Sequence, residues 1–165
     1  ALRDFTHGRF QVVIAESDDI KPAKVERVVF CAGKVYYDLL EARRAGKLDD
    51  VAIVRIEQLY PFPQVEYAQM IALYANARDI VWCQEEPQNQ GAWYQIRHRL
   101  QEPLKTRHTL SYAGRAASAS PAAGYAQLHV QQQKALIQEA LGAEAAGHQE
   151  SAQQNTKSKA VSEQA

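Results

Sequence analysis

The sequence predicts an α/β protein, a three-layer α/β/α sandwich around a five-stranded, mostly parallel sheet. Short apolar runs rich in β-branched residues alternate with segments of helical periodicity, the pattern of parallel strands joined by helical crossovers. The runs at 27–32 and 51–56 are apolar almost throughout, as is typical of strands covered on both faces. Hydrophobic residues make up 46% of the 165 residues, enough for one domain with its own core.

The composition changes near position 142. All aromatic residues lie before position 126, and from Gly142 onward the only β-branched aliphatic residue is Val161. Such a segment buries too little apolar surface to offset the entropy that it loses on ordering. We therefore predict a folded domain over 1–141 and a disordered low-complexity tail over 142–165.

The first half of the domain is predicted to hold two strands and a helix. FQVVIA (10–15) is a short strand, a polar connection follows at 18–23, and RVVFCA (27–32) is a buried strand. Gly33 then turns the chain into a helix. Arg43 and Arg44 suit the dipole of its last turn, and Gly46 supplies its end.

The second half continues the alternation. VAIVRI (51–56) is a strand, and the prolines of the following EQLYPFP exclude both helix and internal strand. Further strands are predicted at 79–83 and 109–113, and helices at 64–76, 93–104 and 125–141. If the winding reverses between the strands at 27–32 and 79–83, Gly33 and Glu85 flank the crevice where open α/β sheets meet ligands. The apolar stripe of the helix at 64–76 is predicted to be Val65, Ala68, Ile71, Ala72 and Ala75.

Charge and cysteine content exclude several classes of protein. Lys and Arg total 19 against 19 Asp and Glu, for a net charge of +0, whereas a nucleic-acid binder carries a basic excess on one face. The apolar stretches are far shorter than the ~20 residues that span a bilayer, so we expect no membrane partner. Cys31 and Cys83 lie inside apolar runs, which indicates reduced, buried thiols and a cytoplasmic location.

No motif marks a catalytic, cofactor or metal site. The five histidines are scattered, without metal-ligand spacing. Gly33-Lys34 lacks the remainder of a phosphate-binding loop, and the dinucleotide-binding glycine pattern is absent. Ser118 and Ser120 lack a nucleophile elbow. We therefore assign no catalytic, cofactor-binding or metal-binding residue to this chain.

The most distinctive stretch is IVWCQEEPQNQGAW (80–93), in which an apolar strand runs into Glu85 and Glu86. Two carboxylates can act as general acid and base when their pKa values are separated, but adjacent side chains at a strand end point in opposite directions. We expect one glutamate to pair with Lys34 or Arg97 and the other to face solvent or a partner chain. The aromatic flanks favour a contact surface, with candidate interface residues Glu85, Glu86, Asn89, Gly91 and Trp93.

A second candidate site is a patch for an anionic effector. Lys34 follows a strand at the same sheet edge, where it can hold an anion. Arg115 offers charge and the hydroxyls of Ser118 and Ser120 offer donors to a phosphate group. The alternatives are a solvated first-turn lysine and a solvated or dimer-contacting loop.

Several phrases together resemble one family. VVFCAGKVYYDLLEARR, VAIVRIEQLYPFP, IVWCQEEPQNQGAW and YAGRAASASPAAGY are similar to the C-terminal end of bacterial 2-oxoglutarate dehydrogenase, the thiamine diphosphate-dependent decarboxylating component of its complex. The resemblance covers residues 1–141 without a gap. It implies a transketolase C-terminal-like fold, a mixed five-stranded sheet whose first strand is antiparallel.

The resemblance also implies what this chain does not hold. In the family, thiamine diphosphate and magnesium lie between the two preceding domains, and the third domain supports the dimer and in some members binds effectors. The full enzyme decarboxylates 2-oxoglutarate and passes the succinyl group to the lipoyl domain of dihydrolipoyl succinyltransferase. We expect a homodimeric partner, no cofactor bound by this chain, and no activity of this chain alone.

The sequence therefore supports three hypotheses about the function of this chain. The first is a C-terminal structural domain of 2-oxoglutarate dehydrogenase. The second is a stand-alone α/β module that binds a nucleotide or acyl-CoA effector. The third is a purely structural dimerisation domain.

Overall fold

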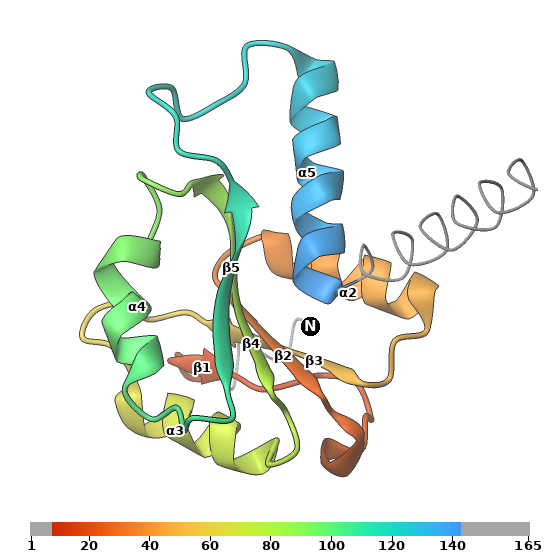
Figure 1. Cartoon of the computed structure of the whole chain (residues 1–165), viewed down its shortest axis with the longest axis vertical. Coiled ribbons are helices and arrows are strands. Elements are labelled where there is room, and N and C mark those ends of the chain that lie inside the picture. Colours follow the sequence, from red (N-terminus) through yellow and green to blue (C-terminus); the bar gives the residue numbers. More distant parts are fainter. Residues whose placement is uncertain (1–7, 143–165) are drawn as a thin grey trace, which may run out of the picture.

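The computed structural model describes residues 8–142, which form one sheet with helices on both faces (Figure 1). The predicted tail lies outside the described residues, apart from Gly142. The elements in chain order are β1 (Val13–Ile14), the 3₁₀ helix η1 (Pro22–Lys24), β2 (Arg27–Cys31), α2 (Val35–Gly46), β3 (Val51–Ile56), α3 (Gln64–Leu73), β4 (Asp79–Pro87), α4 (Trp93–Gln101), β5 (Thr109–Arg115) and α5 (Ala126–Leu141).

The five strands lie in the order β1-β3-β2-β4-β5, and every pair is parallel except β1 with β3. The predicted five-stranded, mostly parallel sheet is thus confirmed, and so is the antiparallel first strand that the resemblance implies. β2 lies between β3 and β4, so the chain winds outward on one side of β2 and then returns to build the other side. The expected reversal therefore falls between β2 and β4.

Alternate residues of the central strands supply two separate cores. Val28 and Phe30 of β2 point to one face and pack with α3 and α4, while Val29 and Cys31 point to the other and pack with α2 and α5. This alternation is the period-two geometry of a strand. The predicted three-layer α/β/α sandwich is confirmed, and helices of both layers flank the sheet in Figure 1. Cys31 and Cys83 are both free and buried, as expected.

Four of the five predicted strands differ in length from the observed ones; β2 and β5 differ by one and two residues, and β1 and β4 differ more. β1 covers only Val13 and Ile14, because it pairs with β3 through a register of two residues. β4 runs to Pro87, four residues beyond the predicted end at Cys83, because it continues to pair with β5 past Cys83. Glu85 and Glu86 therefore belong to a strand and not to the turn after it.

The predicted apolar stripe of α3 is correct at Ile71, which is buried, and wrong at most of its other positions. Val65 is 66% exposed and Ala72 is exposed, whereas Tyr67, which the predicted stripe left out, is buried. The Tyr67 hydroxyl donates a hydrogen bond to the Leu100 carbonyl at 2.9 Å. A tyrosine can be buried when its hydroxyl has such a hydrogen-bond partner. The prediction considered only aliphatic residues, so it missed a buried face to which tyrosine contributes.

The end of α2 also differs from expectation. Gly46 is the last residue of the helix and not its stop; Lys47 takes the left-handed conformation with φ 53°. Its backbone N–H reaches the carbonyls of Arg43 and Arg44, so the last turn is closed by a non-glycine residue. Gly33, by contrast, has a positive φ of 72° and turns the chain from β2 into α2.

A buried ionic network ties the segment after β1 to α2 and β3. Arg43, whose side chain is 3% exposed, forms two hydrogen bonds with Glu16, at 2.5 and 3.0 Å, and one with Asp18 at 2.6 Å. Glu16 also accepts the backbone N–H of Ile53 at 2.8 Å. Hydrogen bonds from Arg44 and the charges of both arginines lower the pKa of Asp18 to about 2. Arg43 is therefore an internal clamp, a role that its position in the last helical turn did not predict.

We predict that Arg43→Met destabilises the domain by about 3–5 kcal/mol, because it leaves the carboxylate of Glu16 buried without its counter-charge. Arg44→Met is the matched control: it removes a cation that is 56% exposed and binds the same Asp18, and should cost less than about 1 kcal/mol. Urea unfolding of both variants measures the difference. Equal losses of stability in the two variants would contradict the role of Arg43 as an internal clamp.

Candidate functional site

The carboxyl ends of β2, β4 and β5 meet at one edge of the sheet and bring distant residues together. Lys34 follows β2, Glu85 lies near the end of β4, and Arg115 is the last residue of β5. Because these three strands are parallel neighbours, their ends face the same side. We call the polar network at this place the carboxyl-edge network.

Gln133 of α5 is the centre of the carboxyl-edge network. Its amide nitrogen donates to Asp38 at 2.8 Å and to Glu85 at 3.0 Å, and its amide oxygen accepts from Arg115 at 3.1 Å. Lys34 donates to the same Glu85 oxygen at 2.5 Å. One side chain of α5 thus connects α2, β4 and β5. The sequence offered no signal for Gln133, which lies in a run of three glutamines.

The charges of the carboxyl-edge network balance. Its cations are Lys34 and Arg115, and its carboxylates are Glu85 and Asp38. The hydrogen bond with Glu85, followed by the charges of Glu85 and Asp38, raises the pKa of Lys34. Glu85 accepts hydrogen bonds from both Lys34 and Gln133 and joins β4 to α2 and α5, so this edge has the character of a structural contact.

The two adjacent glutamates face different surroundings. Glu85 points into the network, with its side chain 20% exposed, whereas Glu86 is exposed. Of the two expected local partners, Lys34 is the one found; the Arg97 guanidinium lies 5.7 Å from the ring centroid of Tyr94. The side chains of the two adjacent glutamates thus point in different directions, as predicted for neighbours at a strand end.

Gln84, which the sequence did not single out, anchors this end of β4. Its side chain is buried, and its oxygen accepts the indole N–H of Trp82 at 2.9 Å and the backbone N–H of Trp93 at 3.1 Å. Its nitrogen donates to the carbonyls of Glu86 and Pro87, each at 3.2 Å. Between Gln84 and Pro87 the register with β5 shifts, and a bulge of this kind leaves backbone groups unpaired. Gln84 therefore stabilises the bulge and joins it to the start of α4.

The remaining candidate interface residues surround this anchor. A Cβ at Gly91 would lie 2.1 Å from the Gln84 amide nitrogen, so the glycine is required by close approach. Trp93 packs against Tyr112 with ring centroids 5.4 Å apart. Asn89 forms two hydrogen bonds with the backbone of Ser118, at 2.9 and 3.0 Å, and joins the β4–α4 turn to the loop after β5.

The candidate effector residues do not form one cluster of donors. Lys34 and Arg115 belong to the carboxyl-edge network, where carboxylate or amide oxygens already hold them. The Ser118 hydroxyl accepts the N–H of Ser120 at 3.2 Å, and the Ser120 hydroxyl donates to the Ala122 carbonyl at 2.9 Å. The serines thus organise their own loop, and the buried Nε of Arg115 is without a hydrogen-bond partner.

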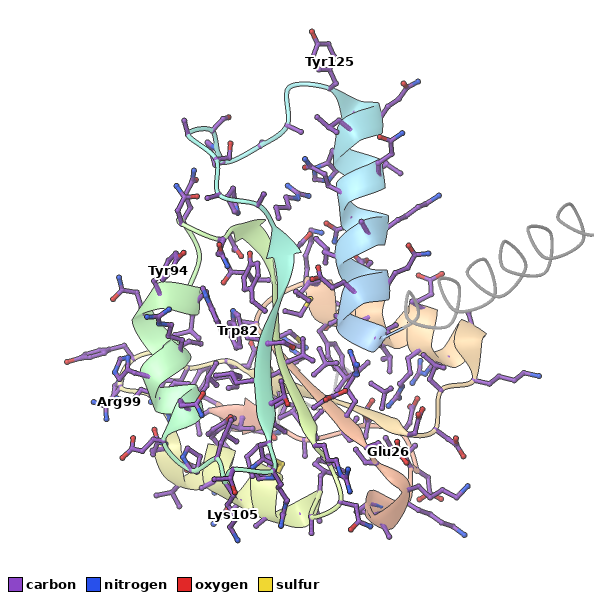
Figure 2. All side chains as sticks on the ribbon, viewed as in Figure 1. Glu26, Trp82, Tyr94, Arg99, Lys105 and Tyr125 are labelled. Atoms are coloured by element: carbon purple, nitrogen blue, oxygen red, sulfur yellow. The ribbon has the colours of Figure 1, made fainter. Side chains whose placement is uncertain are left out.

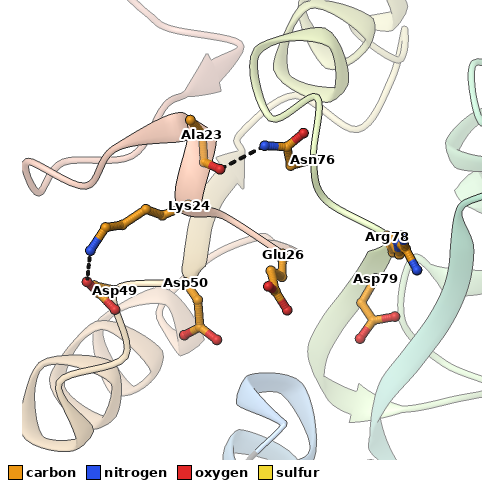
Figure 3. Close-up of a pocket in the computed structure, with 8 residues that line it drawn as sticks. All are labelled: Ala23, Lys24, Glu26, Asp49, Asp50, Asn76, Arg78 and Asp79. Atoms are coloured by element: carbon orange, nitrogen blue, oxygen red, sulfur yellow. Dashed lines mark hydrogen bonds and ion pairs between the residues drawn. The ribbon is translucent and has the colours of Figure 1, made fainter.

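The opposite edge of the sheet carries a hollow of about 820 Å³ (Figure 3). Glu26, Asp49, Asp50 and Asp79 line it, and Lys24 pairs with Asp49 at 3.0 Å. Arg27 pairs with Asp79 at 2.9 Å. Over the described range 8–142, no three His, Cys, Asp or Glu side chains are grouped to hold a metal ion. This hollow therefore carries more carboxylates than cations, with Lys24 and Arg78 as the cations in its lining, and lies at the amino ends of the strands.

The fold and the carboxyl-edge network define a doubly wound α/β domain whose switch-point edge is closed by internal pairing. The family model described as 2-oxoglutarate dehydrogenase C-terminal matches residues 1–141. The chain therefore belongs to the 2-oxoglutarate dehydrogenase C-terminal family, as the resemblance predicted.

Similar proteins carry consistent names. The chain is 55% identical over 141 residues to the 2-oxoglutarate dehydrogenase E1 component of Haemophilus influenzae, and 54% identical over 143 residues to that of Azotobacter vinelandii. The matches cover 86% and 85% of this chain but 15% of each relative, so the chain spans about 15% of their length. None of the helices in the described part of the chain is long and apolar enough to cross a membrane.

We predict that Gly91→Ala destabilises the domain by about 1–3 kcal/mol, because the added methyl group displaces the Gln84 amide from its four hydrogen bonds. Gly124→Ala, with no atom within 4 Å of the new Cβ, is the control and should change stability by less than about 0.5 kcal/mol. Thermal or urea unfolding compares the two. If Gly91→Ala left the stability unchanged, the anchoring role of Gln84 would be contradicted.

Proposed function

We propose that this chain is the C-terminal structural and dimerisation domain of a 2-oxoglutarate dehydrogenase. The observation that carries the proposal is the family match over residues 1–141, together with relatives named as the E1 component. The geometry supports a structural role, because the ionisable groups at the switch-point edge are held by one another. Candidate interface residues Glu86 and Asn89 are exposed at that edge.

The proposed parent enzyme decarboxylates 2-oxoglutarate on thiamine diphosphate and magnesium in the citric acid cycle. It transfers the succinyl group to a lipoyl domain of dihydrolipoyl succinyltransferase and works as a cytoplasmic homodimer. The side chains described for this chain do not fit the metal, since no three potential ligands are grouped within 8–142. We propose that the cofactor ligands and the proton-transfer groups lie in other parts of the longer protein.

This chain alone should show no 2-oxoglutarate decarboxylation when thiamine diphosphate and magnesium are added. The reason is that the proposal places the cofactor ligands in other parts of the longer protein, while Glu85, the half-buried carboxylate at the edge, accepts structural hydrogen bonds from Lys34 and Gln133. Release of labelled carbon dioxide from 2-oxoglutarate measures the reaction. Turnover above a denatured-protein blank would overturn the assignment of catalysis to other parts of the enzyme.

A second candidate function is the binding of a nucleotide or acyl-CoA effector. One observation favours it: the buried Nε of Arg115 has no hydrogen-bond partner, and such a donor is stabilised by an acceptor. Against it stands the balanced charge around Lys34 and Arg115, since a phosphate approaching this edge meets Glu85 and Asp38. An effector therefore has to displace Glu85 from Lys34 when it binds.

If this candidate function is correct, AMP or an acyl-CoA gives measurable heat of binding to the chain, and Arg115→Ala weakens the affinity roughly tenfold or more. Arg97→Ala, which removes an exposed arginine from α4, is the control and should leave affinity unchanged. Isothermal calorimetry measures both, with unfolding midpoints to verify that Arg115→Ala remains folded. If no binding were measured, or if Arg115→Ala left the affinity unchanged, the effector-binding function would be rejected.

A further inference from the structure

A pocket of about 720 Å³ lies between the turn after β3 and helix α4. We call it the turn pocket. Its apolar lining comes from the turn and from the start of α4 with the residue before it: Leu59, Tyr60, Pro61, Phe62, Ala92 and Ile96. The pocket lies on the face of the sheet that α3 and α4 cover. No residue of the carboxyl-edge network lines it, so it is a separate feature of the surface.

The turn pocket presents apolar side chains that the described part of the chain leaves exposed. Tyr60 is 93% exposed and Leu59 36%, and Tyr94 of α4 is 49% exposed. A tyrosine offers a large contact area at a low cost in side-chain entropy, and tyrosine is enriched in protein interfaces. Contiguous exposed apolar surface with a polar rim marks an interaction site. The turn pocket with its projecting Tyr60 therefore has the composition of a docking surface.

The walls of the turn pocket are held in place by hydrogen bonds within the domain. The Gln58 amide donates to the Pro61 carbonyl at 2.7 Å and closes the turn. The Gln64 amide donates to the Arg99 carbonyl at 3.1 Å and joins the start of α3 to α4. The ring of Pro61 also fixes the backbone φ of the turn at that residue. A surface that is positioned before binding loses less conformational entropy on association, so the pocket is suited to docking.

The charged part of the turn pocket is basic. His98 and Arg99 line it, and no Asp or Glu does. Arg97 adds a second cation to α4, which contains no acidic residue. The carboxylate of Glu102 lies 3.6 Å from Arg99, but both side chains are more than half exposed, and an ion pair in this setting contributes little. Glu66 of the adjoining helix α3 is outside the lining. The pocket therefore favours a partner that brings a carboxylate.

The polypeptide enters the domain next to the turn pocket. The backbone N–H groups of Glu57 and Gln58, directly before the turn, donate to the carbonyl of Val12 at 2.9 and 3.3 Å. Phe10, two residues earlier, is 70% exposed. The chain spans about 15% of the length of its relatives and matches the 2-oxoglutarate dehydrogenase C-terminal family. In the proposed function, the preceding part of the longer protein therefore joins the domain at this side.

We propose that the turn pocket is the surface on which the preceding part of the longer protein docks. The docked segment places an apolar side chain against Leu59 and Phe62 and a carboxylate beside Arg99. The inference rests on the proposed function and goes beyond it, because it names the contact surface and the chemistry of the partner. A second copy of this chain fits the pocket less well, since a two-fold contact brings Arg97 and Arg99 close to their own counterparts.

Hydroxyl-radical footprinting compares the 165-residue chain with the longer enzyme that contains it. We expect Tyr60 and Leu59 to be oxidised severalfold more slowly in the longer enzyme, because the docked segment keeps water and radicals away from them. Leu73 of α3, which is 47% exposed and does not line the pocket, is the internal control and should be oxidised at the same rate in both. Mass spectrometry of the digested protein measures each rate.

Charge reversal at Arg99 tests the chemistry of the partner. In the longer enzyme, Arg99→Glu should raise the oxidation rate of Tyr60, because it sets two carboxylates against each other. Lys105→Glu makes the same change of charge at an exposed site outside the pocket and should leave that rate unchanged. Figure 2 shows the two side chains apart, with Arg99 on the outer side of α4 and Lys105 beyond the end of that helix. Unfolding midpoints of the 165-residue variants verify that both remain folded.

The outcomes separate the inference from the function on which it rests. A purified longer enzyme that does not decarboxylate 2-oxoglutarate overturns the proposed function and the docking surface together. An active enzyme in which Tyr60 is oxidised as fast as in the 165-residue chain overturns the docking surface alone. Equal effects of Arg99→Glu and Lys105→Glu overturn the role of the carboxylate. Protection of Tyr60 in the 165-residue chain that increases with its concentration assigns the pocket to a second copy and also overturns the inference.

Discussion

The pairing of β2 with β4 is the constraint on which the rest of the molecule depends. These strands are buried on both faces, so their backbone groups have no access to water and must bond to neighbouring strands. With β3 on the other side of β2, the chain has to reverse its winding at this pair. That reversal places the turn after β2 next to the end of β4, which is why Lys34 meets Glu85.

Polar groups at this edge are used to hold elements together. Gln133 connects α5 to α2, β4 and β5, and Gln84 connects the β4 bulge to α4. Both residues are neutral amides, which donate and accept at once without the cost of burying a charge. A carboxylate pair that sequence reasoning considers for acid–base chemistry thus becomes one member of an internal ion pair and one exposed residue.

The strand-helix alternation and most element positions could be predicted, because apolar runs and turn residues report them locally. β3 is predicted to the residue, and β2 and α5 to within one residue. The misses have physical causes. The buried face of α3 is carried by Tyr67, whose hydroxyl finds a partner only in the folded chain. β4 continues through Glu85 and Glu86 because β5 supplies a partner strand, which overrides the weak strand preference of glutamate.

The sequence by itself determined the class of fold, the two buried thiols and the family to which the chain belongs. These follow from local hydrophobic pattern and from long phrases such as YPFP and EEPQNQGAW. Tertiary structure alone decided that Arg43 is a buried clamp and that Gln84 and Gln133 are anchors. Each of these depends on which side chains from distant segments meet in space, and on whether water or another group satisfies them, which local pattern does not record.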